Sequence, residues 1–135
     1  MAIQLSTTVR NARLDAIETA VGASAVLKIR SGAAPANCGT ADSGTVLAAL
    51  TLPSDWMAAA SSGSKSKSGT WEDTSADAAG TAAHFRLYAS DGTTCHMQGT
   101  VTATGGGGDM TVDNTSFASG QAFTVTAFTL TDGNA

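Results

Sequence analysis

The sequence predicts a mainly β fold, an antiparallel β-sandwich or barrel-like domain with one N-terminal α-helix. Apolar segments with two-residue alternation recur after residue 24, and Gly, Asp and Pro turns separate them. Only residues 6–22 follow the period of a helix. At 135 residues the chain fits one domain with one core, so we expect residues 1–135 to form a single β-rich unit.

The first 22 residues predict an extended apolar arm over residues 1–5 and a helix over residues 6–22. Small or apolar side chains recur at helical spacing up to Val21. Ser6 offers an N-cap oxygen, and Gly22 stands where a helix can end in a left-handed residue. We expect the solvent-facing side of this helix to carry its polar residues, Arg10, Asn11, Asp15 and Glu18.

The β domain is predicted to occupy residues 25–131, with six to eight strands. Residues 25–30 alternate between apolar and basic side chains, as in a half-buried strand. Residues 45–52 form a nearly continuous apolar run, which indicates a strand covered on both faces. A loop of small residues over 31–44 joins the two strands.

The segment after these strands predicts little regular structure. Pro53 ends the apolar run, and residues 54–57 are expected to begin a short helical turn. The composition of residues 61–69, SSGSKSKSG, predicts a mobile loop. Lys65 and Lys67 would then lie at its solvated tip.

Residues 82–89 and 93–102 predict a hairpin. A two-residue loop at its tip would pair Leu87 with His96 and place the apolar residues of the two strands on opposite faces. A three-residue loop instead pairs Leu87 with Cys95, and this register is the one we expect. It groups six side chains on one outer face: His84, Arg86, Tyr88, Thr94, His96 and Gln98.

The last third of the chain predicts two more strands. Residues 105–108 are a glycine turn, residues 109–113 a short strand and residues 122–131 a long one. The apolar parity of the long strand changes along its length, which predicts a bulge or bend near Ala127, or burial on both faces.

Composition excludes several function classes. The net charge is −4, and seven Lys and Arg residues form no basic stripe of the kind that binds nucleic acid. No apolar run reaches membrane-spanning length, and the N-terminus does not resemble a signal peptide, so we expect no membrane partner and no Sec export. Only 13% of residues are charged and 5% aromatic, which favours a surface covered by neighbouring proteins. A secreted domain with a Thr-rich β surface is the alternative.

No pattern indicates catalysis or a cofactor. His84 and His96 are diagonal neighbours in the expected register, but no third metal ligand accompanies them. The acids at 72, 73 and 77 fit neither a calcium loop nor a recognisable carboxylate pair. The glycine turn lacks the lysine of a phosphate loop, and no G-x-S-x-G motif occurs. Cys95 and His96 point to opposite faces of one strand. We therefore expect no enzyme, no metal and no cofactor.

Exposed aromatic and apolar residues are the candidates for partner binding. Trp56 and Trp71 border the predicted loop, and Tyr88 lies on the predicted outer face. The alternative is that both tryptophans cap the ends of a small core. The predicted partner-binding residues are Ile3, Leu5, Trp56, Trp71, His84, Arg86, Tyr88 and His96.

The two cysteines, Cys38 and Cys95, form no metal-binding motif. They can bridge only if the fold brings their Cα atoms within about 6 Å. For a protein made in the cytoplasm, we expect two free thiols.

Five segments spread over nearly the whole chain resemble a family of small virion proteins of tailed bacteriophages: AIQLSTTVRNARLDAIETAVGA, LKIRSGAAPANC, TVLAALTLPSDW, GTAAHFRLYASDGT and GGDMTVDNTSFASGQAFTVTAFTLTDGNA. The resemblance implies a virion component made in the host cytoplasm and present in several copies. Its strongest implied role is a head decoration (cement) protein bound to the major capsid protein. A tail or fibre-associated subunit that binds receptors or glycans is the second implied role. The resemblance carries no catalytic residues.

Overall fold

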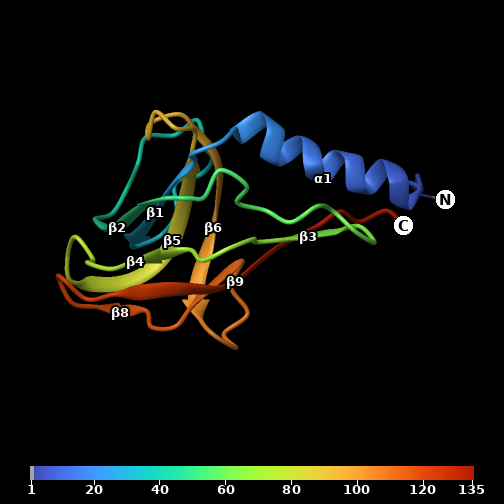
Figure 1. Cartoon of the computed structure of the whole chain (residues 1–135). Coiled ribbons are helices and arrows are strands. Elements are labelled where there is room, and N and C mark those ends of the chain that lie inside the picture. The colour runs from blue at the N-terminus through green and yellow to red at the C-terminus, as the bar shows by residue number, and fades with distance from the viewer. Residues whose placement is uncertain (1) are drawn as a thin grey trace.

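The computed structural model describes residues 2–135, and within them one N-terminal helix precedes nine strands (Figure 1). The mainly β prediction is confirmed, and the sheet curls into a half-barrel. The elements are α1 (Thr7–Val21), β1 (Val26–Ser31), β2 (Val46–Thr51), β3 (Ser64–Ser66), β4 (Glu72–Asp73), β5 (Gly80–Tyr88), β6 (Cys95–Ala103), β7 (Met110–Val112), β8 (Ser116–Phe117) and β9 (Phe123–Thr131).

The strands follow the order β2-β1-β5-β6-β7-β9-β3, with β4 paired to β9 and β8 paired to β5. Among these described pairs, β6 and β7 run parallel and the others antiparallel. Because β7 is only three residues long, it pairs with β6 at 101–103 alone. The carboxylate of Asp109 accepts hydrogen bonds from the N–H and hydroxyl of Thr100, at 2.8 and 2.9 Å, where the pairing stops.

The core lies inside the curl of the sheet and contains both tryptophans. Trp56 and Trp71 are 0% and 1% exposed, and their ring centroids are 6.0 Å apart. Phe128 contacts Trp71 and Phe85, each with ring centroids 5.6 Å apart. The indole N–H groups of both tryptophans donate to backbone carbonyls, which satisfies their polar atoms inside the core.

Several predicted elements are confirmed. The helix begins after its N-cap Ser6 and ends at Gly22, which has a φ of 89°. Four of the strands fall within about a residue of their predicted bounds: β1, β2, β7 and β9. The expected bulge lies at Thr126, because Ala127 and Val125 pair with adjacent residues of β7. The predicted helical turn at 54–57 is wrong, since Met57 forms a β-bridge instead.

The predicted register of the β5–β6 hairpin is also wrong. Leu87 pairs with Met97, and a bulge after Leu87 lets Tyr88 pair with Cys95. The loop is longer than expected because Asp91 folds it locally. Its carboxylate accepts from the N–H groups of residues 93 and 94, both at 2.8 Å.

The helix α1 projects away from the half-barrel, with β3 and the C-terminal residues beside it (Figure 1). The N–H of Leu5 donates to the carbonyl of Asn134 at 2.6 Å, so the two ends of the described chain lie together. No helix within residues 2–135 is long and apolar enough to cross a membrane.

Candidate interaction surface

The helix α1 turns its polar side toward the rest of the protein. Asn11, Asp15 and Glu18 accept hydrogen bonds from backbone N–H groups of the segment 57–63, at 2.9, 3.0 and 3.2 Å. These three residues lie on one stripe of the helix because they are spaced by four and three residues. The stripe thus satisfies the exposed backbone of a neighbouring segment, as a further strand would.

Lys65 also stabilises the contact between α1 and the 57–63 segment. It is only 3% exposed, and its ammonium lies 2.7 Å from Asp15, 2.9 Å from Glu18 and 2.8 Å from the carbonyl of Ala58. Burial alone would lower the pKa of Lys65, but hydrogen bonds to the two carboxylates outweigh it and raise the pKa. The predicted mobile loop at 61–69 is therefore wrong, since β3 lies within it and Lys65 is not at a solvated tip.

Gly63 shows how closely α1 approaches this segment. It has a φ of 73°, and a Cβ atom placed on it would collide with the guanidinium of Arg10. That guanidinium donates to the carbonyl of Asp132 at 3.1 Å. Arg10 therefore joins α1 to the C-terminal residues as well as to the 57–63 segment.

Because the polar side faces inward, the opposite side of α1 faces solvent. Of the 15 helical residues, only Leu14 and Val21 are buried. The outward face of α1 consists of Thr8, Val9, Ala12, Arg13, Ala16, Ile17, Thr19 and Ala20, of which all but the half-buried Ile17 are exposed. The expectation that Arg10, Asn11, Asp15 and Glu18 form the solvent-facing side is wrong, because all four are half-buried and contact other parts of the chain. They lie on the inward side together with Leu14 and Val21.

The N-terminal arm exposes a further apolar side chain. Ile3 is 81% exposed and Val9 is 45% exposed, and they are the two large hydrophobic side chains that stand out in solvent among residues 2–135. Leu5 is half-buried beside the C-terminal residues. Met1, the first residue of the predicted arm, lies outside the described residues. We call Ile3 together with the outward face of α1 the α1 surface.

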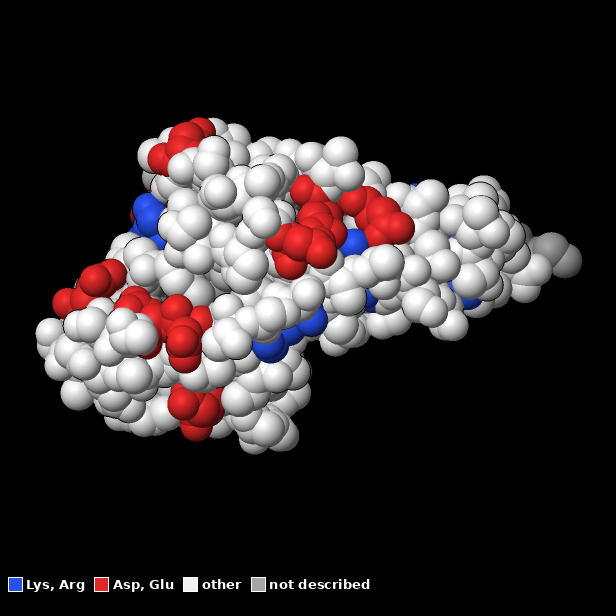
Figure 2. Space-filling view, in the orientation of Figure 1, with Lys and Arg blue, Asp and Glu red and all other residues white. Residues whose placement is uncertain are grey.

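Charge is sparse on the projection that carries this surface. In Figure 2 the outer, N-terminal part of the α1 projection is mostly white on the side shown, whereas Asp and Glu side chains gather over the half-barrel and over the part of the helix nearer to it. A partner that covers the α1 surface would therefore displace water from few charged groups.

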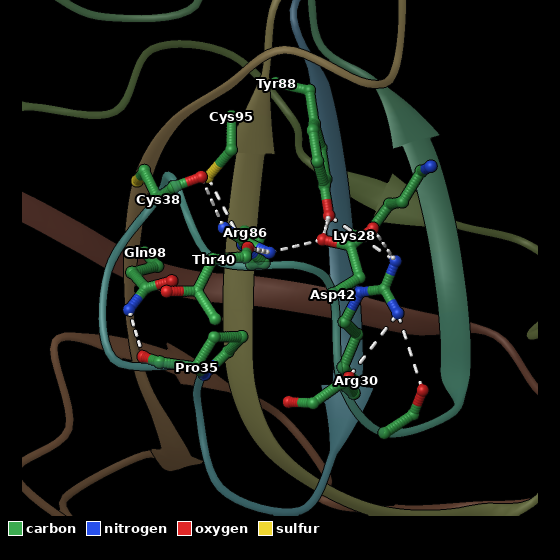
Figure 3. Close-up of polar contacts among 12 residues, drawn as sticks. Lys28, Arg30, Pro35, Cys38, Thr40, Asp42, Arg86, Tyr88, Cys95 and Gln98 are labelled. Carbon is green, nitrogen blue, oxygen red and sulfur yellow. Dashed lines mark hydrogen bonds and ion pairs between the residues drawn. The ribbon is translucent and has the colours of Figure 1, made fainter.

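The predicted outer face of the β5–β6 hairpin is not exposed. Residues 32–44 fold across β1, β5 and β6 and cover it (Figure 3). His84, Arg86 and Tyr88 are each 1% exposed, so the prediction that they form an outer contact face is wrong. Trp56 and Trp71 are buried in the core and do not lie on the surface either. Of the predicted partner-binding residues, Ile3 and His96 are exposed and Leu5 is half-buried.

Asp42 holds the covering loop in place. Its carboxylate accepts a hydrogen bond from the hydroxyl of Tyr88 at 2.7 Å and forms ion pairs with Arg30 and Arg86 (Figure 3). Partial burial opposes ionisation, but the Tyr88 hydrogen bond and the two guanidinium groups outweigh it and lower the pKa of Asp42. The guanidinium of Arg86 also donates to three loop carbonyls, those of Asn37, Cys38 and Thr40.

Tyr88 makes the contact between loop and sheet sensitive to alkali. Burial, followed by the hydrogen bond to Asp42, raises the pKa of Tyr88 to about 12. In the unfolded chain a tyrosine titrates near 10. The raised pKa stabilises the fold fully below about pH 10, and this contribution is lost as pH rises through 12.

Tyr88 is the one tyrosine of the chain, so ultraviolet absorbance of phenolate reports it alone. We expect its titration midpoint in the native protein to lie about 2 pH units above that in denaturant. The urea midpoint should fall over the same interval, and Tyr88→Phe should remove that fall. Equal midpoints in native and denatured protein would contradict the hydrogen-bonded, buried phenol.

The two histidines are not neighbours. His84 pairs with Thr100 across the hairpin, and its Nδ1 lies 2.7 Å from the carbonyl of Gly32. His96 is exposed on β6. The expected diagonal placement of the two rings is wrong, and within residues 2–135 no three His, Cys, Asp or Glu side chains are grouped to hold a metal ion.

A hollow of about 510 Å³ lies beside the contact between α1 and residues 54–59, and its lining includes Asp15, Glu18 and Lys65. Lys65 forms ion pairs with both Asp15 and Glu18, so these two carboxylates are not a free pair. Comparisons with protein-family models, curated proteins and solved structures find no match for this chain. Function is therefore inferred from the surface and from the resemblance described above.

Proposed function

We propose that this protein is a structural subunit of a bacteriophage virion, without catalytic activity, and that it decorates the head by binding across capsid subunits through the α1 surface. The observation that carries the proposal is the composition of the exposed side of α1. Asn11, Asp15 and Glu18 bind the protein's own backbone, and the side in solvent carries small and apolar residues, two threonines and a single charged residue, Arg13.

The physical argument concerns what a partner would gain at this surface. Burying Val9, Ala16 and Ala20 removes apolar area from water, which is favourable, and desolvates no charge. Alanine side chains also allow a partner to approach the helix closely. Arg13 lies at the rim, where its guanidinium pairs with Asp132 at 3.2 Å. An apolar centre with a charged rim is the usual anatomy of a protein interface.

A decoration role fits this surface because cement proteins act by mass action. A subunit that binds only the assembled shell stabilises it by an amount that grows with its concentration and affinity. Many copies on one particle multiply the effect. The partner in this proposal is the major capsid protein or another virion protein, and the chain needs no cofactor for such a role.

The second implied role, a receptor- or glycan-binding tail subunit, has less support. A glycan-binding subunit needs exposed aromatic rings, and the aromatic candidates for partner binding were Trp56, Trp71 and Tyr88. All three side chains are at most 1% exposed, so none of them offers a ring face to a sugar.

The test is co-sedimentation of purified protein with phage heads that lack it. Ala16→Glu places a charge at the centre of the α1 surface and is expected to weaken binding at least about tenfold. The melting temperature should stay nearly unchanged because Ala16 is exposed. Deletion of residues 1–5 should also weaken assembly more than it weakens the monomer fold.

Ala118→Glu is the matched control, since Ala118 is exposed in a turn outside the α1 surface. It should bind heads as the parent does. Equal binding by parent and Ala16→Glu would contradict the assigned surface. Enzymatic turnover by a monomer that ignores phage heads would contradict the proposed function itself.

A further inference from the structure

The fold brings together the two cysteines, which are far apart in the sequence. The Sγ of Cys95 accepts a hydrogen bond from the Nε of Arg86 at 3.3 Å, and another N–H of Arg86 donates to the carbonyl of Cys38 at 2.9 Å. Figure 3 shows the side chains of Cys38 and Cys95 close together beside Arg86.

This contact depends on the bulge in the β5–β6 hairpin. In the expected register, Cys95 would pair with Leu87 and point into the apolar core. Because the register shifts between Leu87 and Tyr88, Cys95 pairs with Tyr88 and lies on the side that carries Arg86. Cys38 comes from the covering loop on that same side. Both thiols are free and half-buried, so a small reagent can reach them.

We propose that Cys38 and Cys95 form an oxidation site, which closes to an intramolecular disulfide by exchange with a small-molecule disulfide and so fastens residues 32–44 to β6. The proposal does not rest on the proposed virion role. It concerns the covering loop, which lies on β1, β5 and β6 rather than on the α1 surface.

The structure assigns a different part to each thiol. Cys95 is the attacking sulfur, because the positively charged guanidinium of Arg86 donates a hydrogen bond to it. Burial, followed by the hydrogen bond to Cys95, raises the pKa of the Cys38 thiol, so Cys38 stays protonated and resolves the intermediate.

The exchange balances without any further reagent. The Cys95 thiol loses its proton to solvent, and the thiolate attacks one sulfur of the oxidant and forms a mixed disulfide with it. The disulfide bond of the oxidant breaks, and its other sulfur leaves as a thiolate and takes up a proton. The Cys38 thiol then loses its proton and attacks the Sγ of Cys95, expelling the second half of the oxidant as a thiol. Two protein thiols are oxidised to one disulfide, and one small disulfide is reduced to two thiols.

The bond would change stability because it closes a long loop of chain. Linking residues 38 and 95 restricts the unfolded chain much more than the folded one, in which both side chains already lie beside Arg86. A rise in melting temperature of roughly 10 °C is expected for a cross-link of this span in a chain of this size. The reduced protein remains folded because Asp42 already holds the loop.

The test uses the purified full-length chain with oxidised glutathione as the probe. We expect intact-mass measurement to show the loss of two hydrogen atoms, and thiol titration in denaturant to fall from two groups to none. The melting temperature should rise by roughly 10 °C, and a reductant should reverse the change.

Single and double variants separate the site from general oxidation. The Cys38→Ser variant should accumulate one glutathione, bound to Cys95. The Cys95→Ser variant should react with oxidised glutathione at least about tenfold more slowly than the Cys38→Ser variant does. The double variant, Cys38→Ser with Cys95→Ser, should have the same melting temperature in oxidising and in reducing buffer. A parent protein that keeps both thiols, or that carries a separate glutathione on each, would overturn the proposal.

Discussion

Asp42→Asn is expected to lower the free energy of unfolding by about 3 kcal/mol, near the lower end of the range for breaking a buried ion pair. The substitution keeps the shape of the side chain and removes its charge. Arg86 is 1% exposed and Arg30 is 5% exposed, so both guanidinium groups would remain buried without their carboxylate. The side chain of Asp42 itself is 39% exposed, and water there would offset part of the loss.

Urea denaturation at neutral pH measures this effect, with Asp55→Asn as the control because Asp55 is exposed and the charge change is the same. The free energy of unfolding of the control should stay within about 0.5 kcal/mol of that of the parent. Because the pKa of Asp42 is lowered in the folded protein, its contribution is present above the ordinary carboxyl pKa and is lost as pH falls below it. Asp42→Asn should therefore make the free energy of unfolding less dependent on pH below about pH 4. A parent-like urea midpoint would show that the loop is held in another way.

The double substitution Asp15→Asn with Glu18→Gln is expected to detach α1 from the 57–65 segment. Both amides keep an oxygen that can accept from the backbone N–H groups, so the change removes charge and little else. Lys65 would then be buried without a counter-charge, and leaving its ammonium in that state costs about 3 kcal/mol. We expect a lower urea midpoint and a loss of helical circular dichroism before the β signal changes.

A third substitution identifies the cause. Adding Lys65→Met to the double variant removes the buried charge and should recover part of the lost stability. The exposed pair Asp55→Asn with Glu72→Gln provides the charge-matched control. A triple variant that is no more stable than the double variant would mean that the amides, and not the unpaired ammonium, disturb the contact.

Elements encoded by neighbouring residues could be predicted from the sequence. The cap at Ser6, the end at Gly22 and the change of parity in β9 depend on residues within a few positions, and all three are confirmed. The hairpin register failed because Asp91 lengthens the loop by bonding to Thr94, a side-chain effect that apolar alternation does not reveal.

Elements encoded by distant residues could not be predicted. The sequence of residues 61–69 reads as a mobile loop because its stabilising partners, Asp15 and Glu18, lie on the helix. The polar side of α1 likewise reads as solvent-facing until its partners are known. The sequence did contain one indication of the covering loop. Arg86 and Tyr88 lie on the same face of their strand, where a buried arginine would require a carboxylate partner, and Asp42 is the one acid between residues 31 and 44.

The short strand β7 has a consequence for solubility. Beyond the three residues that β7 covers, β6 presents an open edge to which a strand of another molecule could add. Asp109 lies where such addition would begin, and its carboxylate already accepts the hydrogen bond from the N–H of Thr100. A negative charge at this point makes the edge a poor template, so the half-barrel can stay open without growing into sheets that join one molecule to the next.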